Sequence, residues 1–273
     1  MIEINQLCFR YPQNEQWILD NLNLTIKPGE FVAVLGQNGS GKSTLARQLN
    51  AILLPDKGSV VIDGMDTADK EKLWDIRQHV GMIFQNPDNQ MVATVVEEDI
   101  AFGLENLGVN SREIRKRVKE ALAYVGMDRF SRKEPHLLSG GQKQKVAIAG
   151  VLAMRPRYLI MDEPTAMLDP VGRQEVMSTA MRLNREEGLT VVNITHFMEE
   201  AVLADKVLVM EQGRIVMQGS PYEVFNHGEI LRQVGLDLPR MAELKLELVK
   251  RGLYLPSEIL TLEEMVDAIC DLD

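Results

Sequence analysis

Apolar and polar residues alternate along residues 2–11 and again along residues 17–26. Alternation with a period of two predicts a half-buried strand in each segment. Residues 31–35 are instead continuously apolar, which favours a strand buried on both faces. A glycine-rich loop follows this strand, and we expect a helix to begin near Lys42.

Strand and helix patterns alternate through the rest of the main part of the chain. Short apolar runs predict strands, and apolar residues at helical spacing predict helices. This alternation indicates an α/β fold built on a mostly parallel sheet with helices on both faces. The predicted strands are residues 60–62, 80–84, 158–161 and 190–194, the predicted helices are residues 171–187 and 197–204, and residues 206–210 and 214–217 form a predicted hairpin.

Two regions depart from this alternation. Residues 112–125 are charged with apolar residues at helical spacing, which predicts a mainly helical insertion over approximately residues 95–155. After about Ser220 the character changes again, and Thr261 and Glu264 have the spacing of a capping box. We therefore expect a main domain over residues 1–225 and a C-terminal helical extension over residues 226–273.

Composition and charge narrow the class of protein. The chain has 273 residues, of which 45% are hydrophobic and 26% charged, and no apolar stretch approaches the ~18 residues of a membrane helix. The N-terminus lacks the basic start and apolar run of a signal peptide. The net charge of −10 argues against a nucleic-acid partner. Two isolated cysteines, Cys8 and Cys270, fit a reducing compartment.

Residues 36–43 read Gly-Gln-Asn-Gly-Ser-Gly-Lys-Ser and match G-x-x-x-x-G-K-[ST] at every defined position. Glycines let successive backbone N–H groups point at phosphate oxygens, and the following helix presents its positive end. Lys42 can reach the β- and γ-phosphates, and Ser43 offers a hydroxyl to Mg²⁺. The segment therefore predicts a site for ATP and Mg²⁺.

Two carboxylates, Asp162 and Glu163, follow the apolar residues 159–161. Ligands bind at the carboxyl ends of parallel strands, so both side chains are expected at the phosphate loop. Asp162 is placed to hold Mg²⁺, and Glu163 is placed to polarise the attacking water as general base. The alternative is a helix-capping pair beyond a strand, which the phosphate loop makes less attractive.

The segment Leu-Ser-Gly-Gly-Gln at residues 138–142 has a plausible helix N-cap in Ser139, and its glycines expose backbone N–H groups. It is a second potential anion site on the same chain. If the two sites lie far apart, one nucleotide can occupy both only when two chains pack head to tail. Taken alone, the segment is also consistent with a simple capped helix.

Together these segments resemble the ABC ATPase family, and the resemblance covers roughly residues 1–224. It implies a P-loop NTPase core with an N-terminal antiparallel β part, a helical insertion and a small C-terminal helical appendage. In the family, the residue matching Tyr11 stacks on adenine, and the loop matching Asp169 crosses the dimer interface. The residue matching Gln85 touches Mg²⁺ and the attacking water, and the residue matching His196 contacts the γ-phosphate.

The resemblance thus assigns every expected site residue. The catalytic residues are Glu163, His196 and Gln85; the ATP-binding residues are Tyr11, Gly36, Gln37, Asn38, Gly39, Ser40, Gly41, Lys42, Ser43 and Thr44; the residues that contact the other chain's ATP are Ser139, Gly140, Gly141 and Gln142; the dimer loop carries Asp169; and the metal ligands are Ser43, Gln85 and Asp162. Two positions depart from the common pattern, since Ala166 and Lys145 stand where serine and arginine are common. Lys145 keeps the charge without the planar fork, so we expect a working ATPase.

Residues 85–90 and 147–156 resemble the ATPase subunits of energy-coupling factor transporters, bacterial importers of vitamins or transition-metal ions. The resemblance implies a peripheral protein on the cytoplasmic face of the cell membrane. Its implied partners are a second ATPase chain, identical or paralogous, a transmembrane coupling protein and a substrate-capturing membrane protein. The segment after Gln85 and the helical insertion would form the groove for the coupling protein.

A soluble ABC ATPase of DNA repair or translation is the alternative. Such proteins carry tandem cassettes, coiled coils or zinc modules, and the sequence shows none of these.

Within the extension, Leu238, Met241, Leu244 and Leu248 form an apolar stripe. The stripe either packs on its own chain or aids dimerisation.

Overall fold

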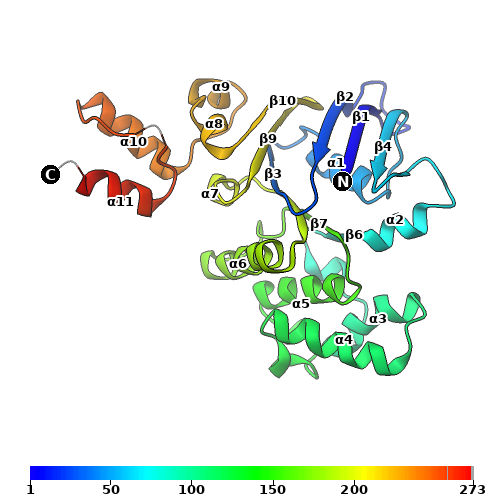
Figure 1. The fold of residues 1–273 in the computed structure, drawn as a ribbon. Helices are drawn as coiled ribbons and strands as arrows, with labels where there is room; N and C mark the ends of the chain where they lie inside the picture. Colours follow the sequence, from blue (N-terminus) through cyan, green and yellow to red (C-terminus); the bar gives the residue numbers. More distant parts are fainter. Residues whose placement is uncertain (257, 272–273) are drawn as a thin grey trace.

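A six-stranded sheet runs through the middle of the computed structural model, which describes residues 1–256 and 258–271 (Figure 1). The pairings β6–β7, β7–β8, β8–β3 and β3–β9 are parallel, and β9–β10 is antiparallel. The mostly parallel sheet predicted from the sequence is therefore confirmed. In spatial order its strands are β10 (Arg214–Gly219), β9 (Lys206–Glu211), β3 (Phe31–Gly36), β8 (Thr190–Ile194), β7 (Tyr158–Asp162) and β6 (Val80–Ile83).

The central strands are buried on both faces, because each face of the sheet carries its own hydrophobic core. Phe31, Ala33 and Leu35 of β3 belong to one core, which also contains the apolar residues of the helical insertion. Val32 and Val34 belong to the other, which contains the apolar faces of α1 (Lys42–Leu49) and of the second sheet. The continuous apolar run at residues 31–35 thus serves two cores at once.

The second sheet is antiparallel and lies beside the first, in the order β2-β1-β4-β5 (Figure 1). Its strands are β1 (Ile2–Phe9), β2 (Leu19–Ile26), β4 (Lys57–Ile62) and β5 (Met65–Asp66). The strand predicted over residues 17–26 is observed as β2, which begins two residues later than predicted, at Leu19. Trp17 lies outside it. The Trp17 ring instead lies beneath the cations of Arg10 and Lys57, 5.0 and 5.3 Å from its centroid.

The helical insertion consists of α3 (Val96–Asn106), α4 (Ser111–Tyr124) and α5 (Gly140–Ala153), which pack on one another at one end of the molecule (Figure 1). The other helices of this part are α2 (Leu73–His79), α6 (Pro170–Glu187) and α7 (Met198–Ala201), and the 3-10 turns are Pro87–Asn89, Asp128–Phe130 and Pro135–Leu137. The sequence prediction missed α2 and made α7 too long. No helix in the described ranges is long and apolar enough to cross a membrane.

The C-terminal extension is helical, as predicted, and projects from the β10 end of the central sheet (Figure 1). After α8 (Pro221–Phe225), which ends the main domain, it comprises α9 (Gly228–Gln233), α10 (Arg240–Lys250) and α11 (Leu262–Cys270), while residues 257 and 272–273 lie outside the described residues. The predicted capping box is present, because Thr261 and Glu264 exchange both hydrogen bonds. Tyr222 of α8 also donates its hydroxyl to Glu264, which anchors α11.

The predicted stripe on the extension divides between two environments. Met241 and Leu248 pack against apolar residues of α11 and its preceding loop. Leu238 is buried within the main core, whereas Leu244 is 41% exposed. Most of the stripe therefore packs on its own chain.

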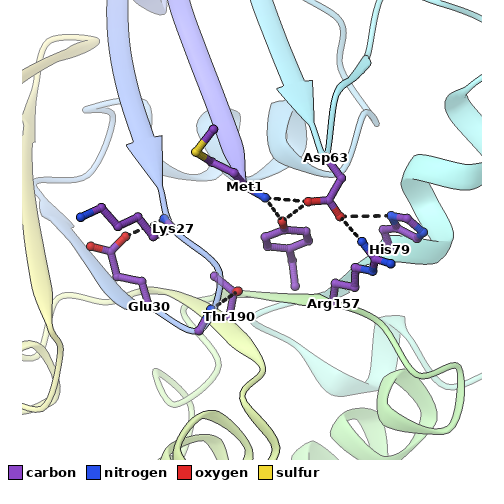
Figure 2. Close-up of polar contacts among 9 residues, drawn as sticks. Met1, Lys27, Glu30, Asp63, His79, Arg157 and Thr190 are labelled. Atoms are coloured by element: carbon purple, nitrogen blue, oxygen red, sulfur yellow. Dashed lines mark hydrogen bonds and ion pairs between the residues drawn. The ribbon is translucent and has the colours of Figure 1, made fainter.

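Asp63, in the turn between β4 and β5, joins the two sheets through Tyr158 of β7 and also binds the α-ammonium of Met1 (Figure 2). Asp63 accepts hydrogen bonds from Met1 (2.6 Å), from the Tyr158 hydroxyl (2.6 Å) and from Arg157 (3.1 Å), and His79 lies 3.4 Å away. Burial alone would raise the pKa of Asp63, but these hydrogen bonds outweigh it and lower that pKa to about 2. The start of β7 is thereby pinned to the antiparallel sheet.

Candidate functional site

The phosphate loop connects the buried strand β3 to α1. Gly41 has φ 102°, and a Cβ there would lie 2.9 Å from the Ile18 carbonyl oxygen, so only glycine fits. Lys42 is 4% exposed, and its ammonium donates to the carbonyls of Gly36 (2.7 Å) and Gln37 (3.0 Å). Burial lowers the pKa of Lys42, while the carboxylates of Glu163 and Asp162 oppose that shift. A cation is thus held inside the loop where phosphates would bind.

Oxygen atoms from α1 and β7 meet at the mouth of the loop. The Ser43 hydroxyl donates to Asp162 Oδ1 at 2.8 Å, and Asp162 is 6% exposed. Burial raises the pKa of Asp162, the hydrogen bond from Ser43 lowers it, and the neighbouring Glu163 raises it further. A carboxylate and a hydroxyl are hard oxygen donors, which fit Mg²⁺.

Glu163 lies where four elements converge. Its carboxylate accepts a hydrogen bond from Gln85 Nε2 (3.3 Å) after β6, and it lies 3.9 Å from His196 Nδ1 after β8. The Lys42 ammonium lies 4.0 Å from its other oxygen. The structure therefore brings together the predicted catalytic residues, with a carboxylate at the centre that can accept a proton. Their individual roles stay predictions.

Tyr11 lies beside the same loop, directly after β1. Its hydroxyl is 3.4 Å from the Thr44 hydroxyl, and its ring packs edge-on against Phe9. An open cleft of about 1080 Å³ adjoins the loop at Gly39; residues 13–18 and 211–214 line it, and Tyr11 does not. The cleft has room for a nucleoside next to the phosphate loop.

Residues 138–142, called the signature from here on, and the predicted dimer loop at Asp169 lie against each other. Ser139 caps α5 in a capping box with Gln142, and Asp169 caps α6 by accepting from Gly172 N at 2.8 Å. A Cβ on Gly141 would lie 3.2 Å from Gly172 Cα, so the two helix N-termini meet backbone to backbone. Throughout residues 1–256 and 258–271, no hydrogen bond or ion pair joins residues 139–142 to the phosphate loop. This arrangement is compatible with a nucleotide shared between two chains.

Three side-chain carboxamides cover the outer edge of β6, and the sequence prediction missed them. Gln90 donates to Met82 O (3.0 Å) and accepts from Phe84 N (3.2 Å), as a neighbouring strand would. Gln144 of α5 donates to Phe84 O at 3.2 Å, and Asn50 donates to Val80 O. Phe84, the residue before Gln85, is therefore tied through its backbone to Gln90 and to α5. From sequence alone, glutamines next to a loop are expected to be solvated. The contacts of these carboxamides with β6 could therefore not be predicted.

A buried carboxylate, Glu200, links the loops that carry Glu163 and His196. Glu200 is 3% exposed and accepts hydrogen bonds from the Thr165 hydroxyl (2.5 Å) and from Asn193 Nδ2 (3.2 Å). The sequence prediction did not include it. A glutamate on the apolar side of the short predicted helix was the available signal, because buried carboxylates need hydrogen-bond partners.

The phosphate loop, the acidic pair and the capped glycine helix on an α/β sheet define the class: a P-loop ATPase of the ATP-binding-cassette type. The family model described as ABC transporter matches residues 19–166, and a model described as the energy-coupling factor transporter EcfA1 C-terminal domain matches residues 242–272. The chain belongs to the ABC transporter family, in its energy-coupling factor branch.

Relatives and solved structures agree with this assignment. The energy-coupling factor transporter ATP-binding protein EcfA1 of Clostridioides difficile (strain 630) is 57% identical over 274 residues, covering 100% of this chain and 99% of the relative. EcfA1 of Ligilactobacillus salivarius is 49% identical and covers 99% of this chain and 95% of the relative. The structure of cbiO1 from Clostridium perfringens, part of the ABC transporter complex cbiONQ, has TM-score 0.78 and 40% identity, over 90% of this chain and 98% of that one.

A second solved structure, the ATP-binding cassette MJ0796 in a dimeric post-hydrolysis state bound to ADP and Pi, has TM-score 0.74 and 33% identity. It covers 81% of this chain and 99% of that one. The predicted ABC ATPase fold and ATP hydrolysis are confirmed by these likenesses, and the alternative of a DNA-repair or translation ATPase is not favoured. The chain is an ATP-binding ATPase that energises energy-coupling factor transport.

Proposed function

We propose that this chain hydrolyses MgATP as one half of a two-chain ATPase that drives the import of vitamins or transition-metal ions. The convergence of Gln85, His196 and Lys42 on Glu163 beside the phosphate loop carries the proposal. The relatives named energy-coupling factor transporter proteins and the dimeric cassette structure support the transport role and the second ATPase chain.

In the proposed reaction, the loop N–H groups and Lys42 hold the β- and γ-phosphates. Ser43, Asp162 and Gln85 would hold Mg²⁺, which would supply positive charge to the phosphates. Glu163 accepts the proton of the attacking water, and His196 contacts the γ-phosphate. Tyr11 stacks on the adenine.

The second chain supplies the rest of the site. In a head-to-tail dimer, residues 139–142 of one chain face the γ-phosphate on the other chain's loop, and Asp169 lies at the interface. ATP therefore holds the dimer closed, and hydrolysis lets it reopen. The exposed Leu244 and Val249 of α10 offer further apolar area to the same dimer.

The membrane partner docks at a groove between Met91 and the helical insertion. A cavity of about 120 Å³ lies there, lined by Gln90, Met91, Ile100, Gly103, Gly150 and Met154 among others. Gln90 also bonds to β6 beside Gln85, so movement at the groove reaches the catalytic carboxylate through one strand end. A coupling protein seated there would place the chain on the cytoplasmic face of the membrane, with a substrate-capturing protein beside it.

Glu163→Gln tests the catalytic assignment. Because only the proton acceptor is lost, we expect turnover to fall by about 10²-fold or more while ATP binding persists. Steady-state phosphate release and nucleotide binding by the complex measure the two quantities. Glu71→Gln, on an exposed loop before α2, is the control and should match wild type. Wild-type turnover of Glu163→Gln would remove Glu163 from the mechanism.

Co-purification from detergent-solubilised host membranes tests the transport assembly. We expect a small polytopic membrane protein and an ATPase chain to accompany this protein. Met91→Glu and Gly150→Leu should release the membrane protein and leave the ATPase pair intact, since both changes obstruct the groove. Recovery of soluble factors or nucleic acid alone would contradict the transport assembly without affecting the ATPase assignment.

A further inference from the structure

The aromatic ring of Phe197 lies between a cation and the predicted catalytic histidine. The guanidinium carbon of Arg173 is 3.3 Å from the Phe197 ring centroid. The ring centroids of His196 and Phe197 are 4.1 Å apart, with an angle of 41° between their planes. One aromatic side chain therefore contacts both a residue of α6 and the imidazole that faces Glu163.

The cation–ring contact covers part of Arg173, which is half-buried. In the described part of the chain, Arg173 Nε is buried and has no hydrogen-bond partner. A planar guanidinium is weakly hydrated and stacks on aromatic faces, so the Phe197 ring compensates for its burial. The backbone of Phe197 is fixed as well, because its N–H donates to the Thr195 hydroxyl at 3.0 Å.

His196 needs such support because it is 45% exposed and lies in a loop after β8. An exposed side chain on a loop samples several rotamers, and catalytic geometry is lost by displacements of about 1 Å. A ring packed on one side of the imidazole restricts that sampling and keeps Nδ1 facing Glu163.

Arg173 in turn belongs to the N-terminal turn of α6, where the signature helix is seated. The backbone N–H of Arg173 donates to the backbone carbonyl of Asp169 at 2.9 Å. The adjacent Gly172 packs against Gly141 of α5. Arg173 therefore lies in the helical turn between this corner and the Phe197 ring, so a second chain that contacts the corner contacts the turn that carries Arg173.

We propose that Phe197 and Arg173 are positioning residues that hold His196 toward Glu163 and make that alignment depend on the corner formed by Asp169 and Gly141. The proposal rests on the proposed role of His196. In the closed dimer, residues 139–142 of one chain contact the ATP on the other chain's loop. The same contact thereby aligns His196, which faces the ATP on its own chain's loop. The two ATP sites are coupled through residues of a single chain.

The test measures MgATP turnover by the purified transporter complex carrying Phe197→Leu, which keeps apolar volume but lacks the ring face. We expect kcat to fall about tenfold and the KM for ATP to stay within about twofold, because binding groups are untouched. Arg173→Met should lower kcat to a similar extent with an unchanged KM. Phe197→Tyr keeps the ring face and should retain wild-type turnover. Phe130→Leu removes an aromatic ring under Lys133 in the helical insertion and is the matched control.

Combination with His196→Ala separates positioning from general structural damage. If the ring acts through the histidine, Phe197→Leu should change nothing further in a His196→Ala background. An equal loss in both backgrounds, or wild-type kcat for both Phe197→Leu and Arg173→Met, overturns the proposal. Full activity of His196→Ala alone overturns the role of His196 and this inference together. Thermal unfolding of each variant verifies the fold, and Arg173→Met gives the answer if Phe197→Leu does not fold.

Discussion

Glu163 holds a backbone conformation that residues with a Cβ seldom adopt. Its φ is 51°, and its N–H donates to the carbonyl of Ile194 at 3.0 Å, which fixes the turn between the strand and the following loop. This left-handed conformation costs roughly 1–2 kcal/mol for a residue other than glycine. The strain aims the carboxylate at Gln85 and His196, so this arrangement of the three side chains is obtained at the expense of stability.

In a helix, an alanine variant is more stable than a glycine variant. At Glu163 we expect the reverse order of stability for Glu163→Gly and Glu163→Ala. We expect the glycine variant to be more stable by about 1 kcal/mol, because glycine adopts φ > 0 without strain. Thermal unfolding measures the difference. At Lys119, in the exposed face of α4, the alanine variant should be the more stable one. Equal stability of the two Glu163 variants would show that the turn relaxes.

At the scale of elements, α5 and α6 approach each other backbone to backbone at Gly141 and Gly172. Gly141→Ala would place a Cβ 3.2 Å from Gly172 Cα, and this neighbour is backbone that cannot rotate away. We expect a loss of about 1–3 kcal/mol in the free energy of unfolding and a fall in turnover. Gly150→Ala in the same helix meets nothing within 4 Å and should gain up to about 1 kcal/mol. Chemical denaturation distinguishes the two, and a stable, active Gly141→Ala protein would contradict the close packing.

Elements with strong local patterns could be predicted, and weak ones could not. The helices of the insertion have several buried apolar residues each, whereas α2 buries only Ile76 and exposes Trp74, so its periodicity is faint. At the site, the phosphate loop is one continuous segment, residues 36–43, so its motif could be recognised from the sequence. The contacts of Phe197 with Arg173 and of Glu200 with Thr165 join residues far apart in the chain. Only the fold brings such pairs together.

At the scale of the whole molecule, Asp63 ties the N-terminus and the antiparallel sheet to β7. Its folded-state pKa of about 2 is below the ordinary value of 3.8, so its contribution to stability is complete above pH 4. That contribution is lost as the pH falls from about 4 toward 2. Asp63→Asn should lower the unfolding temperature at neutral pH and converge with wild type near pH 2. Thermal scans from pH 2 to pH 7 measure this, and a pH-independent difference would contradict it.

The three carboxamides on β6 have a consequence outside catalysis. β6 is an end strand of the central sheet, and an uncovered end strand is a template on which another chain can add a strand. Asn50, Gln90 and Gln144 occupy the hydrogen-bonding groups that such an intruder would use. The side chains that bond to β6 and to Phe84 beside Gln85 therefore also oppose the addition of a strand from another molecule. A variant that removes one of them should shorten the time for which the purified protein stays in solution.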